Sequence, residues 1–371
     1  MVTHSTDVIR IPMQGPGDVS GLAQLLDSGA LDPQRIVAIL GKTEGNGGVN
    51  DFTREYAAAA LSAELAVRLG LSARQIEERI AFVMSGGTEG VLSPHITVFT
   101  RAPVGSRRAN AVASKRLGIG IAHSRPFLPE EIGRLPQVRE TATSVEMAMA
   151  DAGIADARDV HFVQVKCPLL TSDRIGAATK RGATTVTKSA YGSMGYSRGA
   201  SALGVALALK EINAPVHDTD VLANWDLFSK VASVSAGIEL MNNVVIVLGN
   251  SESSLSELVV GHAVMRDAID LEAAMCALTD VGLLTPGRKF AVDRERLVNI
   301  FAKAEASPSG TVRGYRHTML EDSDINATRH ARAAVGGLLA GLCGTGAVYV
   351  SGGAEHQGPA GGGPIAVIAR V

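Results

Sequence analysis

Three apolar runs of strand length recur along the chain, and a lysine follows each of them closely. The runs are rich in valine, isoleucine, leucine and phenylalanine, which is typical of a buried β-strand. They occupy residues 35–40, 160–165 and 297–302, and the lysines are Lys42, Lys166 and Lys303. We therefore expect three similar strands, each with a lysine near the same end.

An arginine opens an alanine-rich stretch downstream of each lysine. These stretches cover residues 53–61, 197–203 and 328–334, and their arginines are Arg54, Arg198 and Arg329. A serine or threonine precedes each arginine, as expected of a helix N-cap, and alanine favours the helix that follows. In the third stretch Arg332 is an alternative to Arg329. We choose Arg329 because it keeps the register of the other two.

A serine followed by small residues ends each repeat. The three stretches are Val83–Gly87, Ser233–Gly237 and Tyr349–Gly353, with Ser85, Ser235 and Ser351 in equivalent places. Recurrence of strand, lysine, arginine, helix and serine in the same order predicts an α/β fold of three similar repeat units. We place the units at residues 1–104, 105–250 and 251–371.

Amphipathic segments predict further helices in the later units. Residues 140–152 and 263–279 have helical periodicity. The lysine and serine of the middle unit lie furthest apart, and the intervening segment 176–195 is polar and rich in glycine. We expect this segment to be a loop.

The composition is that of a globular protein and excludes several partners. Hydrophobic residues make up 46% of the chain, charged residues 19%, and the formal net charge is −2. No basic tract is available to follow a phosphate backbone, so we expect no nucleic-acid partner. No apolar run reaches the roughly 20 residues of a membrane helix, and Met1–Gln14 lacks the apolar core of a signal peptide. Three scattered cysteines predict neither disulfides nor structural zinc. We expect a cytoplasmic protein without a membrane partner.

Familiar cofactor motifs are incomplete in this sequence. Residues 41–43 end like a phosphate-binding P-loop, but Ile36 stands where the first glycine is required. The Gly-x-Gly sequences at 118–120 and 344–346 lack the third glycine of a dinucleotide fingerprint. We therefore expect no organic cofactor.

Lysine and serine together indicate nucleophilic catalysis. A serine hydroxyl needs a base, and a lysine can be that base when burial or neighbouring positive charge lowers its pKa. Arginines and backbone N–H groups would stabilise an anionic intermediate. The alternative is that the Ser-Gly-Gly stretches only form turns and the lysines are solvated, which the threefold recurrence disfavours.

The C-terminal segment 352–364 is the densest concentration of glycine in the chain. Backbone carbonyls of such a segment, with Gln357 and a nearby carboxylate, suit a hard cation such as Mg²⁺ or Ca²⁺. A glycine-rich turn without an ion is the alternative.

Two motifs resemble the cyanuric acid hydrolase and barbiturase family of cyclic amide hydrolases. They are Ser85–Gly90, which continues into Ser93-Pro94-His95, and Ser351–Pro359. The resemblance extends over all three units. It implies three alike units around a pseudo-threefold axis, a barrel-like core of strands with helices outside, and an active site on the axis.

The resemblance also implies roles for particular residues. Ser235 would be the nucleophile and Lys166 the general base, while Lys42 and Lys303 belong to two supporting dyads. The implied substrate contacts are Arg54, Ser85, Gly86, Arg198, Ser235, Ala236, Arg329, Ser351 and Gly352. The implied ligands of a structural Mg²⁺ or Ca²⁺ are Glu305, Ala354, Gln357, Gly358, Pro359 and Gly362.

The reaction implied by the resemblance is hydrolytic opening of cyanuric acid to carboxybiuret, which yields biuret and CO₂, in s-triazine degradation. Barbiturase activity, which opens barbituric acid to ureidomalonate, is the nearest alternative. A non-catalytic protein that binds a small anion is an alternative of another class. A metal-dependent amidohydrolase finds no support in histidine spacing. The family implies a homotetramer.

Overall fold

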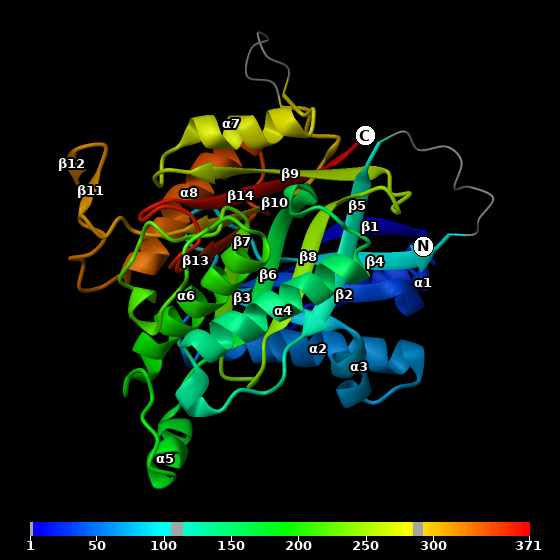
Figure 1. Ribbon diagram of the computed structural model, residues 1–371. Coiled ribbons are helices and arrows are strands. Elements are labelled where there is room, and N and C mark those ends of the chain that lie inside the picture. The colour runs from blue at the N-terminus through cyan, green and yellow to red at the C-terminus, as the bar shows by residue number, and fades with distance from the viewer. Residues whose placement is uncertain (1–2, 105–113, 285–291) are drawn as a thin grey trace.

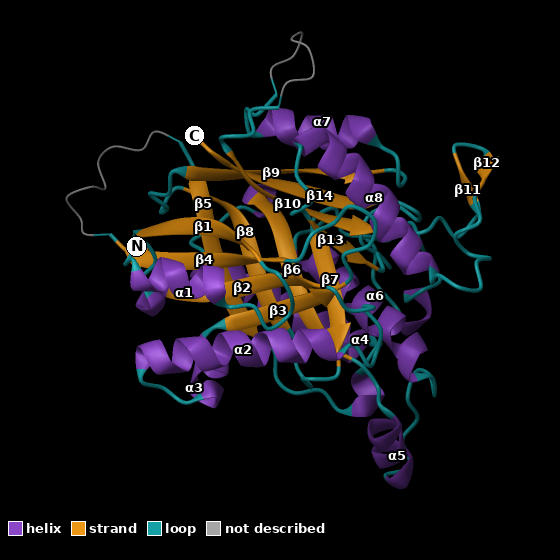
Figure 2. Cartoon of the chain, turned by 180° about the vertical axis from the view of Figure 1, so that it is seen from behind, coloured by secondary structure: helices purple, strands orange, loops and turns teal. Residues whose placement is uncertain are grey.

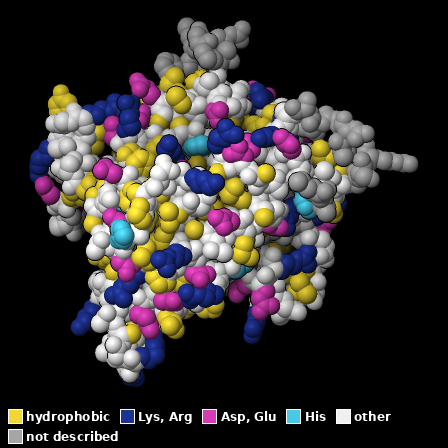
Figure 3. All heavy atoms as spheres, in the orientation of Figure 1, with side chains coloured by type: hydrophobic (Ala, Val, Ile, Leu, Met, Phe, Trp, Pro, Cys, Tyr) yellow, Lys and Arg dark blue, Asp and Glu magenta, His cyan; other side chains and the backbone are white. Residues whose placement is uncertain are grey.

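The computed structural model describes residues 3–104, 114–284 and 292–371. Strands occupy the middle of the molecule and helices cover the outside (Figures 1 and 2). Within the described residues, no helix has the length and apolar character needed to cross a membrane. On the face shown in Figure 3, acidic and basic side chains are interspersed.

Three four-stranded sheets share one connectivity. In each sheet the second strand of the repeat pairs in parallel with the third and antiparallel with the fourth, and the fourth pairs antiparallel with the first. The strand orders are β1-β4-β2-β3, β5-β8-β6-β7 and β9-β14-β10-β13. This mixed α/β fold with three alike sheets confirms the predicted fold class.

The elements of the first repeat are β1 (His4–Pro12), α1 (Ser20–Asp27), β2 (Ile36–Thr43), α2 (Phe52–Leu69), α3 (Ala73–Arg79), β3 (Ala81–Gly86) and β4 (His95–Pro103). Those of the second are β5 (Arg116–His123), α4 (Leu135–Asp151), β6 (Val160–Pro168), α5 (Ser172–Lys180), α6 (Ala190–Ala208), β7 (Ala232–Gly237) and β8 (Val244–Ser251). The third contains β9 (Leu258–Met265), α7 (Leu271–Asp280), β10 (Leu297–Ala304), the hairpin β11 (Thr311–Val312) and β12 (Tyr315–Arg316), α8 (Ala327–Cys343), β13 (Tyr349–Gly352) and β14 (Gly363–Arg370).

The predicted unit boundaries stay a prediction. Residue 105 begins a segment outside the described residues, and Ser251 is the last residue of β8. The four strands of each sheet come from one continuous part of the chain. Parallel pairing of the second and third strands requires a crossover, which α2 and α3, α5 and α6, or α8 provide.

The expected helix caps were wrong. The side chains of Asp51, Ser189 and Asn326 cap α2, α6 and α8. In the middle repeat the difference is largest, because Ser197, the cap expected from the sequence, is a buried residue in the interior of α6. Arg198 therefore projects from the middle of its helix rather than from the start.

Three other expected elements also differ. The helix predicted over 140–152 begins earlier, as α4 at Leu135. The segment 263–279 holds the end of β9 and most of α7. The segment 176–195 is not a loop throughout, because it includes part of α5 and the start of α6. The Thr171 and Ser189 side chains cap these two helices, so local capping outweighs the glycine content of the segment.

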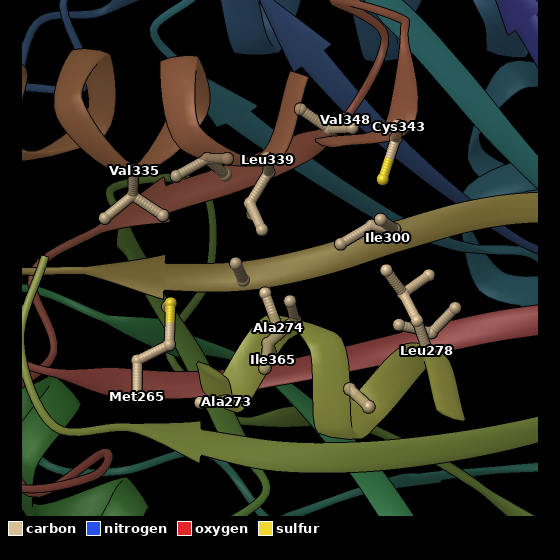
Figure 4. Close-up of a cluster of buried hydrophobic side chains, with 14 of the residues drawn as sticks. Met265, Ala273, Ala274, Leu278, Ile300, Val335, Leu339, Cys343, Val348 and Ile365 are labelled. Atoms are coloured by element: carbon tan, nitrogen blue, oxygen red, sulfur yellow. The ribbon is translucent and has the colours of Figure 1, made fainter. Parts of the chain in front are cut away.

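An apolar core shared by all three sheets lies at the centre of the molecule. Phe99 of β4, Phe162 of β6 and Phe301 of β10 are buried there with Tyr349 of β13. The Phe301 ring centroid lies 5.0 Å from that of Phe162 and 5.5 Å from that of Tyr349. Separate clusters lie between each sheet and its helices. Figure 4 shows the one between α7, α8 and the third sheet.

We expect Phe301→Ala to lower the free energy of unfolding by about 3–5 kcal/mol, because it leaves a cavity where the three sheets meet. Chemical denaturation measures this loss. Phe52→Ala is the matched control, since Phe52 is 74% exposed and its loss should change stability by less than about 0.5 kcal/mol. Equal effects of the two variants would contradict the shared core.

Candidate active site

Parallel pairing places each repeated lysine beside the repeated serine of its own unit. Lys42 is in register with Ser85, Lys166 with Ser235, and Lys303 with Ser351. Neighbouring strands lie about 4.8 Å apart, so side chains at paired positions share one face of the sheet. All three lysines are buried.

The three serine hydroxyls lie close together. Ser351 Oγ is 3.3 Å from both Ser85 Oγ and Ser235 Oγ. Lys42 Nζ donates to Ser85 Oγ at 3.2 Å, and Lys303 Nζ donates to Ser351 Oγ at 3.2 Å. The three repeats therefore contribute equivalent groups to one point.

Lys166 departs from this pattern. Its Nζ donates to the carbonyl oxygen of Met84 at 3.2 Å and lies 2.7 Å from Glu239 Oε1. In the described part of the chain, no hydrogen bond joins Lys166 to Ser235. Ser233, the other serine of this stretch, donates to Gln164 Oε1 at 2.9 Å and is buried away from the cavity.

A cavity opens over the serines. Its lining includes eight of the nine predicted substrate contacts, and Gly47, Met194 and Arg332 line it as well. Those eight are Arg54, Ser85, Gly86, Arg198, Ser235, Ala236, Ser351 and Gly352. An outer cavity beside it is lined by Tyr191, Asn326 and Arg329, among others.

Arg332, rather than Arg329, reaches the central cavity. The Arg332 side chain is 3% exposed, whereas that of Arg329 is 42% exposed. Both pair with Glu89, at 2.6 Å for Arg332 Nη2 and 3.1 Å for Arg329 Nε. The arginine of the third unit that lines the central cavity is therefore Arg332, one helical turn after Arg329, which was chosen from register.

Backbone and carboxylate groups orient the other two arginines. Arg54 Nη1 donates to the carbonyl of Ala236 at 3.0 Å, and Nη2 donates to that of Gly48 at 2.7 Å. Arg198 forms a two-point pair with Glu355, at 2.7 Å for Nε and 2.5 Å for Nη2. Two-point pairing holds the guanidinium plane in one orientation.

Burial and crowding of cations lower the pKa values of the lysines. Burial, together with the nearby Arg198 guanidinium, lowers the pKa of Lys303 to about 7. Burial and then Arg332 hold the pKa of Lys42 well below its usual range. Burial also lowers the pKa of Lys166, although the Glu239 carboxylate opposes that effect. The lysines paired in register with the three serines are therefore of the kind that can act as bases.

Five of the six predicted metal ligands lie in the loop between β13 and β14, and the sixth, Glu305, contacts this loop. Glu305 follows β10, and its Oε2 accepts a hydrogen bond from the Ala354 backbone N–H at 2.6 Å. Burial and the neighbouring Glu355 carboxylate raise the pKa of Glu305 to about 7. The Gln357 side-chain oxygen accepts from the Val234 N–H at 2.7 Å, so Gln357 would offer its backbone carbonyl. Among the described residues, no cluster of three or more His, Cys, Asp or Glu side chains suits a metal.

The sequence offered Arg332 as the alternative to Arg329, but three glutamates near the serines were not predicted. Glu89, Glu239 and Glu355 each stand four residues after the repeated serine. That recurrence was visible in the sequence as a further repeat position. The partners of the glutamates could not be recognised in the sequence, because these partners lie in other units or on the neighbouring strand.

Comparison with known proteins supplies a family. The family model described as "Amidohydrolase ring-opening protein" matches residues 7–370. The chain is 70% identical to the cyanuric acid amidohydrolase of Bradyrhizobium diazoefficiens over the full length of both. It is 59% identical to that of a Pseudomonas species, with 99% of each chain covered.

Solved structures agree with this assignment. A cyanuric acid hydrolase described as an evolutionary innovation by structural concatenation matches with a TM-score of 0.94 and 58% identity, covering 100% of both chains. The cyanuric acid hydrolase of Azorhizobium caulinodans matches with a TM-score of 0.89 and 49% identity, covering 99% of both chains.

Proposed function

The chain belongs to the family of ring-opening amidohydrolases, and we propose on this basis that it opens the ring of cyanuric acid by hydrolysis. The observation that carries the proposal is the threefold arrangement of serines and arginines around one cavity. Cyanuric acid is a planar ring in which three carbonyls alternate with three N–H groups. Three equivalent sets of donors match three equivalent carbonyls.

The proposed reaction begins at Ser235. Its Oγ adds to one ring carbonyl while Lys166, as the neutral amine, accepts the hydroxyl proton. Cationic arginines and backbone N–H groups stabilise the resulting alkoxide. The ring C–N bond breaks as Lys166 returns the proton to the departing nitrogen.

Water completes the cycle. It attacks the acyl-enzyme, Lys166 accepts its proton and returns it to Ser235 Oγ, and carboxybiuret leaves. Loss of CO₂ from carboxybiuret gives biuret. Ser85 and Ser351 would hold the ring. Each of these serines already accepts a hydrogen bond from a lysine.

We expect the purified protein to convert cyanuric acid to biuret and CO₂, and Ser235→Ala to reduce this activity by more than about 10³-fold. Product analysis and mass spectrometry of a trapped acyl-enzyme measure both. Ser85→Ala is the matched variant, which should retain turnover with weaker substrate binding. Turnover of barbituric acid without turnover of cyanuric acid would overturn the proposed substrate, and an acyl group on Ser85 or Ser351 would overturn the proposed nucleophile.

We expect Arg332→Lys to raise the KM for cyanuric acid at least about tenfold, because lysine cannot reproduce a two-point guanidinium contact. Arg329→Lys is the control, and its exposed side chain predicts a change of less than about twofold. Steady-state kinetics distinguish the two. The reverse order of effects would restore Arg329 as the substrate contact.

We also propose that a Mg²⁺ or Ca²⁺ ion binds beside the third serine. The buried Glu305 carboxylate fits this role, because a cation would offset the charge that burial disfavours. Backbone carbonyls of the β13–β14 loop would supply the other ligands, namely those of Ala354, Gln357, Gly358, Pro359 and Gly362. The ion would hold this loop in place.

Chelation is therefore expected to lower the thermal unfolding midpoint by several degrees, and added Mg²⁺ or Ca²⁺ to restore it. Glu305→Gln should be insensitive to both treatments, since it lacks the ligand charge. Differential scanning calorimetry makes the comparison. An unchanged midpoint of the wild-type protein after exhaustive chelation would contradict the site.

We also propose that the protein is a homotetramer in the cytoplasm. The β11–β12 hairpin projects from the body of the molecule (Figure 1), and Tyr315 on it is 82% exposed. An exposed aromatic side chain of this kind is typical of a subunit contact. Light scattering of the purified protein tests the subunit number.

A further inference from the structure

The three repeated glutamates do not have equivalent partners. Glu89 pairs with Arg332, and Glu355 pairs with Arg198, so two of them bind a cavity arginine from another repeat. If the third glutamate followed the same pattern, Glu239 would pair with Arg54, the remaining cavity arginine. Instead Glu239 lies 2.7 Å from Lys166 Nζ, and Arg54 donates to backbone carbonyls.

The turn after each serine explains the difference. Gly87 and Gly353 have φ angles of +108° and +76°, and an arginine side chain lies against each of them. A Cβ on Gly87 would meet Arg332 at 2.5 Å, and one on Gly353 would meet Arg198 at 2.7 Å. At Gly237 the atom in that place is a carboxylate oxygen of Glu239, at 2.0 Å. The middle turn thus packs against its own glutamate where the other turns pack against an arginine.

Glu239 also connects Lys166 with solvent. Its side chain is 42% exposed, compared with 11% for Glu89 and 13% for Glu355. Glu239 and Lys166 both line a second cavity, separate from the central one, together with residues of α2 and α3. The lysine is buried and the glutamate beside it is partly exposed, so the pair lies between the protein interior and this second cavity.

Other charged or titratable groups face this pair. Arg54 of α2 and Arg174 of α5 are close enough to act on Lys166 or Glu239. Cys167 adjoins Lys166. The wall of the second cavity adds three more groups, namely Glu55 of α2, Glu77 of α3 and His123 of β5. Lys166 has its shortest charged contact with Glu239, which is the main group that opposes the effect of burial on the pKa of the lysine.

We propose that Glu239 is the positioning residue of the general base: it holds Lys166 as an ammonium ion away from Ser235, and the base forms when this pair loses its proton to water in the second cavity. The proposal rests on the proposed function of Lys166. The proton leaves Lys166 Nζ, passes to Glu239 Oε1 and then to solvent, and the neutral amine remains. No other bond changes.

The pH dependence of kcat/KM tests the proposal. A base must be deprotonated, so its pKa sets the acid limb of the profile, and activity rises as the pH passes through it. An opposite charge at this distance raises the pKa of a lysine by about 1–3 units. Glu239→Gln removes that charge, and we expect its acid limb to lie about 1–3 pH units below that of the wild type, with activity retained.

Glu89→Gln and Glu355→Gln are the matched controls. They remove the same charge at the equivalent positions but leave the Lys166–Glu239 pair intact, so their KM should rise while the acid limb stays in place. Ionisation of the substrate is common to all variants and cancels in the comparison. An unmoved limb in Glu239→Gln, an equal displacement in the controls, or loss of turnover at every pH in Glu239→Gln would each overturn the proposal.

A second measurement does not depend on hydrolysis. In protein labelled with ¹³C at lysine Cε, the Lys166 signal, assigned with Lys166→Met, should titrate at lower pH in Glu239→Gln than in the wild type. An unshifted titration overturns the proposal. Failure of the wild type to hydrolyse cyanuric acid would instead overturn the proposed function, while this titration would still test the pair.

Discussion

Burial of three lysines around one axis is the constraint on which the site depends. The parallel pairing of the second and third strands of each repeat puts a lysine beside a serine, and threefold repetition brings the three pairs together. Buried cations of like charge are costly, so their pKa values fall and carboxylates must be supplied nearby. Glu89 and Glu355 supply such carboxylates, and each of them pairs with an arginine of another repeat. These ion pairs also tie the repeats to one another.

A symmetric site must still act on a single bond. The serines and arginines preserve the threefold arrangement, which suits recognition of a ring with equivalent carbonyls. The asymmetry lies in the middle repeat, where Ala236 replaces a glycine and Glu239 contacts a lysine. In the proposed reaction recognition and chemistry would therefore be divided: all three repeats would hold the ring, and the contact of Glu239 with Lys166 distinguishes the lysine of the middle repeat from the others.

The sequence predicted the parts of this structure that repeat. Apolar runs, lysines and serines recur in order, so the strands and the convergence of Lys42, Lys166 and Lys303 could be expected from the sequence alone. Helix starts could not be predicted from the arginines, because polar residues upstream supply the caps, most clearly Ser189 of α6. The choice between Arg329 and Arg332 depends on which face of α8 meets the cavity, and register alone does not determine that rotation.

The loop between β13 and β14, together with β10, holds the peptide that precedes Ser235. The Val234 N–H donates to Gln357 Oε1 at 2.7 Å, and the Val234 carbonyl accepts from Lys303 Nζ at 2.9 Å. Both partners belong to the third repeat, yet they hold the strand of the second repeat directly before Ser235. An ion at Glu305 would therefore influence catalysis by fixing this loop, and through it the position of Ser235, rather than by touching the substrate.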